Sequence, residues 1–188
     1  MATLTWYGFK IRVRSYQIKG EALRRIGINP NFCPKGVEVG LTTPFYFKSI
    51  RQIMGIGQDR LGGIYHPKLG KVLVPEDISQ IRLCHEVLHA VFDAVPHPER
   101  EAFSRLVNES QKRAPESRFF KGVAQRTNGD RLFLTEVFAF GGSKVIFERM
   151  GKDEVEKDLG AVPTELRDYF ERNVVDPRLL TVPLQKIA

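Results

Sequence analysis

Two histidines and a glutamate stand in the order His-Glu-x-x-His within the stretch RLCHEVLHAVFD, at residues 85 to 89. Residues four apart lie on one face of an α-helix, so His85 and His89 can present two imidazole nitrogens to one tetrahedral Zn²⁺. Glu86 points about 100° away around the helix, which suits a base acting on a metal-bound water better than a third ligand. The spacing therefore predicts a zinc site with its own general base.

Chance and ordinary burial are the competing explanations of this pattern. With 4 His in 188 residues, the five-residue string is expected by accident in only roughly 0.6% of such chains. Two core histidines are the second alternative, because Ile78, Ile81 and Phe92 share their helical face. Two imidazoles and a carboxylate on a mostly apolar helix are costly to bury without a partner, which favours the metal site.

A catalytic zinc needs a third protein ligand and one open position. The compact three-histidine arrangement is disfavoured, because the sixth residue after His89 is Val95. Among carboxylates, Glu136 stands out in the apolar run LFLTEVFAFGG, where an uncompensated charge is expensive. We expect Glu136 to be the third ligand rather than an ion-pair partner of Arg131, and Glu101 is the alternative ligand.

The completed pattern resembles that of the gluzincin metallopeptidases, in which a glutamate on a later helix completes His-Glu-x-x-His. The segment HEVLHAVFD resembles the thermolysin-type motif, including an aspartate four residues after the second histidine, here Asp93. The form TEVFA and the 46 residues between His89 and Glu136 resemble the anthrax-lethal-factor-like peptidases and the minigluzincins. The resemblance covers about residues 60 to 150. The segment PEREAFSRL, which carries the alternative ligand Glu101, faintly resembles the repressor-cleaving peptidases.

The resemblance implies a zinc-dependent endopeptidase with Zn²⁺ as cofactor and Glu86 as the base that moves the proton. Asp93 would orient a ligand imidazole or form a simple salt bridge. The lethal-factor-like group usually has an oxyanion-stabilising tyrosine about two turns ahead of the ligand glutamate, and this chain has no tyrosine between His89 and Glu136. Candidates for that role are Tyr65, first of all, and His66, Asn128 and Arg131.

The fold predicted to position these residues is α+β and zincin-like, with a small, twisted, mostly antiparallel sheet packed on the active-site helix. We expect one domain over residues 1–188, with a basic α/β part at 1–60, a catalytic core at 61–150 and a helical C-terminal part with a tail at 151–188. Period-two and period-3.6 patterns and turn residues place its elements. The expected strands are 9–16, 37–41 and a hairpin within 62–75. The expected helices are 20–28, 47–55, one signalled by Pro75, Glu76 and Asp77 and ending near Val95, one ending near Lys112, 131–150 behind an Asp130 N-cap, and one or two within 153–175. Residues 114–130 and 176–188 are expected to be irregular or extended.

Charge and composition limit the partners. Residues 1–84 hold 13 Lys and Arg against 5 Asp and Glu, while the remainder is nearly neutral. A basic half is compatible with nucleic acid but most simply forms a solvated face, since no nucleic-acid-binding motif accompanies it. The two alternatives to a free-standing endopeptidase are therefore a DNA-associated metalloprotease docked by this half and a non-catalytic zinc-binding interaction protein.

Neither a signal peptide nor a membrane-spanning run is evident in the sequence, so we expect cytoplasmic localisation. Two cysteines make no disulfide framework, so we expect buried thiols at Cys33 and Cys84.

Two expectations concern the substrate groove. An extended peptide or protein substrate is expected along an edge strand near Gly62 to His66, because main-chain pairing accommodates varied sequences. The apolar tail LLTVPLQKIA is expected to pack elsewhere, and an alternative hypothesis, similar to a device of the minigluzincins, makes it an autoinhibitor of that groove.

Overall fold

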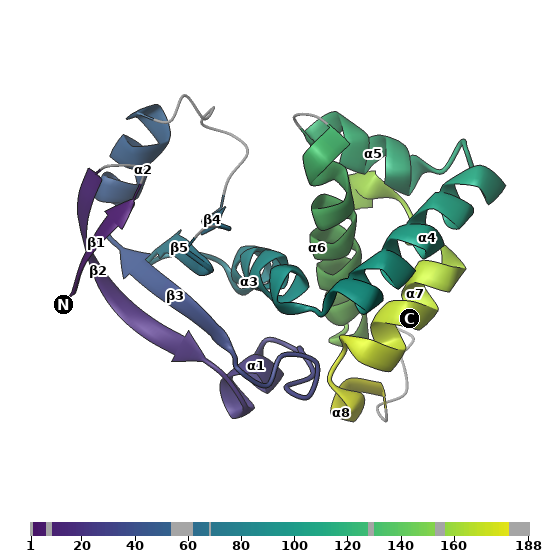
Figure 1. Cartoon of the computed structure of the whole chain (residues 1–188), viewed down its shortest axis with the longest axis horizontal. Coiled ribbons are helices and arrows are strands. Elements are labelled where there is room, and N and C mark those ends of the chain that lie inside the picture. The colour runs from purple at the N-terminus through teal and green to yellow at the C-terminus, as the bar shows by residue number, and fades with distance from the viewer. Residues whose placement is uncertain are drawn as a thin grey trace.

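The computed structural model of the chain describes residues 2–6, 9–53, 62–67, 69–127, 130–152 and 157–180. Within these residues a five-stranded sheet stands beside a group of helices (Figure 1). The elements are β1 Ala2–Trp6, β2 Phe9–Ile18, α1 Glu21–Arg25, β3 Val37–Thr42, α2 Pro44–Ile53, β4 Ile64–His66, β5 Lys71–Pro75, α3 Gln80–Ala94, α4 His97–Arg113, α5 Arg118–Arg126, α6 Asp130–Arg149, the 3₁₀ helix η1 Lys157–Leu159, α7 Thr164–Asn173 and α8 Pro177–Leu180.

The sheet has the strand order β1-β2-β3-β5-β4. Three neighbouring pairs are antiparallel, and only β3 and β5 run parallel. The prediction of an α+β fold with a mostly antiparallel sheet is therefore confirmed. The hairpin of β4 and β5 is also as predicted, and it places the short strand β4 at one edge of the sheet.

Alternation along β5 gives the sheet two buried faces. Val72 and Val74 point into the main core together with Val87 and Val91 of α3. Leu73 points to the opposite face, where it packs with Phe47 of α2. Helix α3 thus lies between the sheet on one side and the helical group on the other, as Figure 1 shows, so it is covered on most sides, as its apolar sequence predicts.

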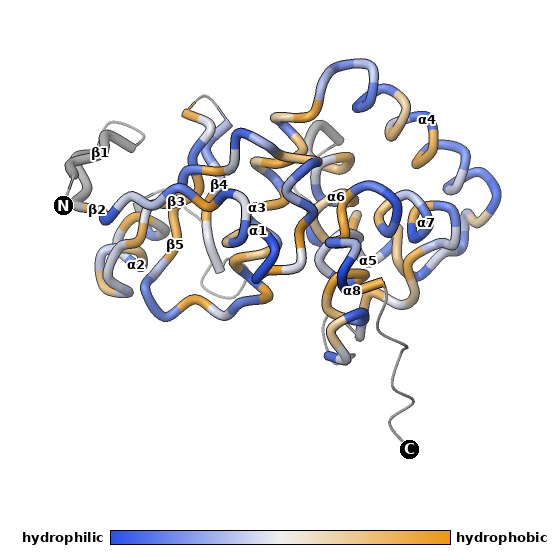
Figure 2. The backbone as a smooth tube through the Cα atoms, turned by 90° about the horizontal axis from the view of Figure 1, so that it is seen from below, coloured by the Kyte–Doolittle hydropathy of each residue, from blue (hydrophilic) through white to orange (hydrophobic). Residues whose placement is uncertain are grey.

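Four phenylalanines hold the helical group together. Phe138 of α6 lies 5.0 Å from Phe92 of α3, 5.2 Å from Phe103 of α4 and 5.5 Å from Phe170 of α7, measured between ring centroids. Mixed edge-on and tilted contacts of this kind are the favoured packing of aromatic rings. Figure 2 shows hydrophilic residues predominating along α4, which lies at the rim of the molecule.

The segment after α7 connects the helical group back to the N-terminal half. Val175 forms an isolated bridge with Ile28, and the Asn29 N–H donates to the Val174 carbonyl at 2.7 Å. The Asp176 N–H donates to the Gly27 carbonyl at 2.9 Å. Residues 174–176 are buried and are therefore part of the core.

Several boundaries differ from the predictions. Helix α3 begins at Gln80 rather than at Pro75, because Pro75 is still paired with Thr42 in the sheet and Ser79 supplies the N-cap. Residues 118–126, predicted to be irregular, form α5, since Phe119, Phe120 and Val123 gain burial in a helix. The predictions also omit β1 and the short α8, which occupies part of the predicted extended tail.

Two further expectations concern burial. Cys33 and Cys84 are both free and buried, as predicted. No helix among the described residues has both the length and the apolar character needed to cross a membrane.

Candidate metal centre

Helix α3 presents its three motif residues to two different neighbours. Its first turn is capped by Ser79, whose hydroxyl oxygen accepts a hydrogen bond from the Arg82 N–H. His85 and His89 point toward α6, while Glu86 contacts Gly63, just before β4. The different directions expected from the helical spacing for the two histidines and for Glu86 are present in the structure.

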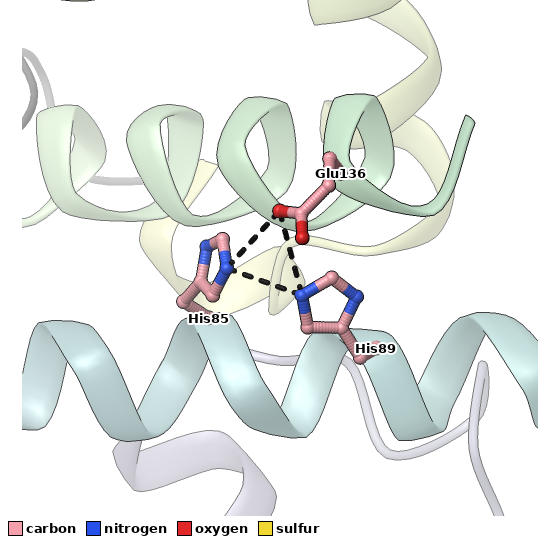
Figure 3. Close-up of side chains that lie close together, drawn as sticks. All are labelled: His85, His89 and Glu136. Carbon is pink, nitrogen blue, oxygen red and sulfur yellow. Dashed lines mark hydrogen bonds and ion pairs between the residues drawn. The ribbon is translucent and has the colours of Figure 1, made fainter. Parts of the chain in front are cut away.

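Helix α6 supplies Glu136 from the opposite side, as Figure 3 shows. It approaches α3 closely at Gly142, where a Cβ atom would lie 3.0 Å from Leu88 Cδ1. The neighbouring Gly141 faces α7 instead, since a Cβ atom there would lie 2.6 Å from Phe170 Cε2. The two adjacent glycines therefore make room for two different helices.

The three predicted ligands converge on one point. His85 Nε2 lies 3.1 Å from His89 Nε2, and Glu136 Oε2 lies 3.5 Å from the first and 3.6 Å from the second. A triangle with these sides leaves its centre about 2.0 Å from each corner, which matches Zn–N and Zn–O distances in proteins. Within the described part of the chain these three residues form the group of side chains with metal-ligand spacing.

The electrostatics favour the protonation states that bind a cation. Burial lowers the pKa of His89 to about 4, assisted by His85 and opposed by Glu136, so its imidazole is neutral at neutral pH. Burial alone would raise the pKa of Glu136, but the hydrogen bond from His85 and the nearby imidazoles outweigh it and leave that pKa below its usual value. A neutral imidazole and an ionised carboxylate are the forms that coordinate metals.

Glu86 is the most enclosed of the motif's polar groups, with 5% of its surface exposed. Burial raises its pKa to about 7; His85 opposes this shift, Glu136 adds to it, and a hydrogen bond from the Gly63 N–H opposes it. Gly63 can make that contact because it has no side chain: a Cβ atom there would lie 2.5 Å from Glu86 Cγ. A carboxylate with a pKa near neutrality is matched to proton transfer.

Tyr65 and Asp93 lie next to the second histidine. The Tyr65 hydroxyl donates to Asp93 Oδ2 at 2.7 Å, and the Tyr65 ring is parallel to the His89 imidazole within 7°. Burial, and then the contact with Asp93, raise the pKa of Tyr65 well above its usual value, so the phenol stays protonated. Both residues are candidates from the sequence alone, but their contact with each other is evident only in the structure.

Phe140 and Arg126 cover the other histidine. The Phe140 ring lies 4.3 Å from the His85 imidazole between centroids, and the Arg126 guanidinium lies 5.2 Å from the centre of the Phe140 ring. Arg126 also forms an ion pair with Asp158. Arg126 is not a candidate from the sequence, because the segment that carries it has no clear periodicity and is predicted to be irregular.

The remaining candidates lie elsewhere. Glu101 is on the exposed side of α4, where its side chain is 56% exposed and 3.6 Å from His97 Nδ1, so it does not join the cluster of ligands. His66 is buried in β4. Asn128 and the side chain of Arg131 lie outside the described residues.

Comparisons with protein-family models, with curated proteins and with solved structures found no match to this chain. No relative therefore assigns a role to any of these side chains. The functional reading depends on the sequence motif and on the geometry of the cluster formed by His85, His89 and Glu136.

Proposed function

We propose that the chain is a zinc-dependent endopeptidase of the gluzincin type. The observation that carries this proposal is the convergence of His85, His89 and Glu136 from two helices at separations that suit one Zn²⁺. A motif of two histidines alone would also fit a pair of core residues. A third donor atom within 3.6 Å of both imidazole nitrogens supplies the three protein ligands that a catalytic zinc site requires.

Each residue has a distinct task in this proposal. A bound Zn²⁺ would supply Lewis acidity and acidify a water molecule. Glu86 would accept the proton of that water and deliver it to the leaving nitrogen of the cleaved peptide. The Gly63 N–H holds the Glu86 carboxylate on the sheet side of α3, away from the ligand face, so that Glu86 remains a base and does not become a fourth ligand.

Strand β4 is the proposed binding edge for an extended substrate. It pairs with β5 on one side and stands last in the strand order of the described sheet. Gly63, which immediately precedes this strand, contacts Glu86, and Tyr65 within the strand stacks with His89. A peptide added to this edge would therefore pass beside the metal ligands, and main-chain hydrogen bonds would hold it without selecting its sequence.

A second candidate, a DNA-associated metalloprotease, has one supporting observation. Phe45 and Tyr46 at the start of α2 are 75% and 51% exposed, and they lie in the basic half of the chain. Exposed aromatic rings among cations are typical of surfaces that bind single-stranded nucleic acid. Salt-dependent binding to single-stranded DNA that is weakened by Phe45→Ala would support this candidate, and absence of binding at physiological ionic strength would exclude it.

The test of the endopeptidase proposal is the Glu86→Gln variant. It keeps the three ligands, so we expect bound zinc at the parent stoichiometry and a loss of peptide cleavage of at least about 100-fold. Glu101→Gln, a change to an exposed glutamate on α4, is the matched control and should keep both properties. Cleavage by Glu86→Gln at the parent rate would contradict the role of Glu86. Stoichiometric zinc without turnover of a peptide library by the parent protein would favour a non-catalytic zinc-binding protein.

A further inference from the structure

Tyr65 reaches His89 from the sheet because of the register of β4. Tyr65 is paired with Val72 of β5, and Val72 belongs to the core that packs against α3. The alternation of a strand therefore directs the Tyr65 side chain toward α3 as well. Its ring centroid lies 6.4 Å from that of His89, with the two planes 7° apart.

Asp93 anchors the far end of the tyrosine. It lies one helical turn after His89, on the same face of α3, and it accepts the Tyr65 hydroxyl hydrogen bond at 2.7 Å. A hydrogen bond to an ionised acceptor is short and strong, and this distance is typical of one. The phenol ring is thus fixed at both ends, by its strand and by this carboxylate.

We propose that Tyr65 and Asp93 are a pair of positioning residues that fix the His89 imidazole for metal binding, and this proposal rests on the metal site proposed above. The imidazole has two ring neighbours: Tyr65 is parallel to it, and the His85 ring is 4.8 Å away between centroids, with an interplanar angle of 85°. Rotation of His89 away from the cluster would break the contact with the anchored phenol. A ligand held in its binding orientation before the ion arrives loses less conformational freedom on binding.

The same hydrogen bond argues against Tyr65 as the oxyanion donor expected from the sequence. A phenol has one proton to donate, and here the proton is directed to Asp93. Donation to a substrate oxygen would require that bond to break and would leave the half-buried Asp93 carboxylate without this partner. Tyr65 therefore acts on the ligand rather than on the substrate.

The test measures Zn²⁺ affinity by competition with a chromophoric chelator, and the visible spectrum after Co²⁺ substitution, in the purified chain. We expect Tyr65→Phe and Asp93→Ala each to weaken zinc binding about 10-fold, as is usual for residues that support a ligand histidine. Asp93→Asn keeps a carbonyl oxygen that can accept the phenol proton, so it should retain most of the affinity. The double variant Tyr65→Phe/Asp93→Ala should bind no more weakly than the weaker single variant, because both changes break one contact.

Tyr169→Phe is the matched control, since Tyr169 is a half-buried tyrosine of α7 that packs on Phe103. It should leave zinc affinity and the cobalt spectrum unchanged. Parent affinity in Tyr65→Phe would overturn the proposal, and parent affinity with lost turnover would assign the phenol to the substrate instead. If the parent itself binds no zinc, the metal site and the positioning role both fail. If the parent binds zinc without cleaving peptides, the endopeptidase proposal fails, while weaker zinc binding by Tyr65→Phe still supports the positioning role.

Discussion

Gly63 lies directly against Glu86 where the chain enters the edge strand β4. A Cβ atom at position 63 would come within 2.5 Å of Glu86 Cγ and 2.8 Å of Val74 Cγ1. Separations this short require a neighbour to move, and Val74 is fully buried in the sheet. Glu86 can therefore keep its position only because residue 63, just before β4, has no side chain.

The Gly63→Ala variant should therefore lose activity while keeping its metal. Either β4 shifts outward or Glu86 is displaced, and overpacking of this kind costs about 1 to 3 kcal/mol of folding stability. We expect peptide cleavage to fall by about 10-fold or more and zinc stoichiometry to be unchanged. Gly40→Ala in β3 is the control, because a Cβ atom there lies at an ordinary 3.4 Å from Leu73. Equal cleavage by Gly63→Ala and the parent would show that Glu86 does not need this contact.

The Glu136→Ala variant distinguishes a metal site from a pair of buried histidines that bind no metal. Glu136→Ala deletes one of the three proposed ligands while leaving both imidazoles, so zinc affinity should fall by at least about 100-fold, a loss of roughly 3 kcal/mol. The measurement is the zinc content that remains after dialysis against a weak chelator. Glu101→Ala removes the alternative ligand, which is exposed on α4, and should leave the zinc content unchanged. Loss of zinc in Glu101→Ala and retention in Glu136→Ala would reverse the assignment.

Zinc should also stabilise the fold, because its proposed ligands lie on two different helices. Binding to the folded chain alone adds about 2.7 kcal/mol when free zinc is 100 times the dissociation constant. For a chain of this length that corresponds to a rise of roughly 5 to 10 °C in the unfolding temperature. The rise should disappear in His89→Ala and after removal of the ion. An unchanged unfolding temperature in the parent at saturating zinc would mean that the cluster binds no ion.

The residues of the cluster could be predicted from the sequence because each carries a local signal. His85 and His89 have helical spacing, and Glu136 is a charge within an apolar run. The supporting contacts could not be predicted in the same way. The pairing of Tyr65 with Asp93 depends on the register between two strands and on how far α3 extends beside them, and nothing in either local sequence encodes that distance.

The fold shows the same division between local and long-range information. Strands and helices with clear periodicity were predicted at nearly correct positions, including the hairpin before α3. Helix α5 was missed because its nine residues give too short a window for a period of 3.6, and its burial depends on η1 and α6. The start of α3 was placed too early because Pro75 and Asp77 are also turn residues, and only the pairing with β3 shows that Pro75 ends a strand.

The two glycines of α6 should respond differently to alanine. Gly142→Ala places a Cβ atom 3.0 Å from the end of the flexible Leu88 side chain, and the gain in helix propensity of about 1 kcal/mol offsets that contact. Gly141→Ala places it 2.6 Å from the fully buried ring of Phe170, which is enclosed by other aromatic rings. We expect Gly142→Ala to stay within about 1 kcal/mol of the parent and Gly141→Ala to be less stable by about 1 to 3 kcal/mol. Chemical denaturation measures both, and a reversed order would contradict these contacts.

The C-terminal tail can be tested as an autoinhibitor only if the truncation spares the core. Val174 and Val175 are fully buried, and Asp176 accepts hydrogen bonds from the Arg178 N–H and guanidinium at 2.8 to 3.1 Å. A chain that ends at residue 173 should therefore lose at least about 3 kcal/mol of folding stability, so reduced activity in it would carry no information on the tail. The informative variant ends at Leu180, after α8. Autoinhibition predicts faster cleavage of a generic peptide by that variant than by the full chain, and equal rates at equal zinc content would exclude it.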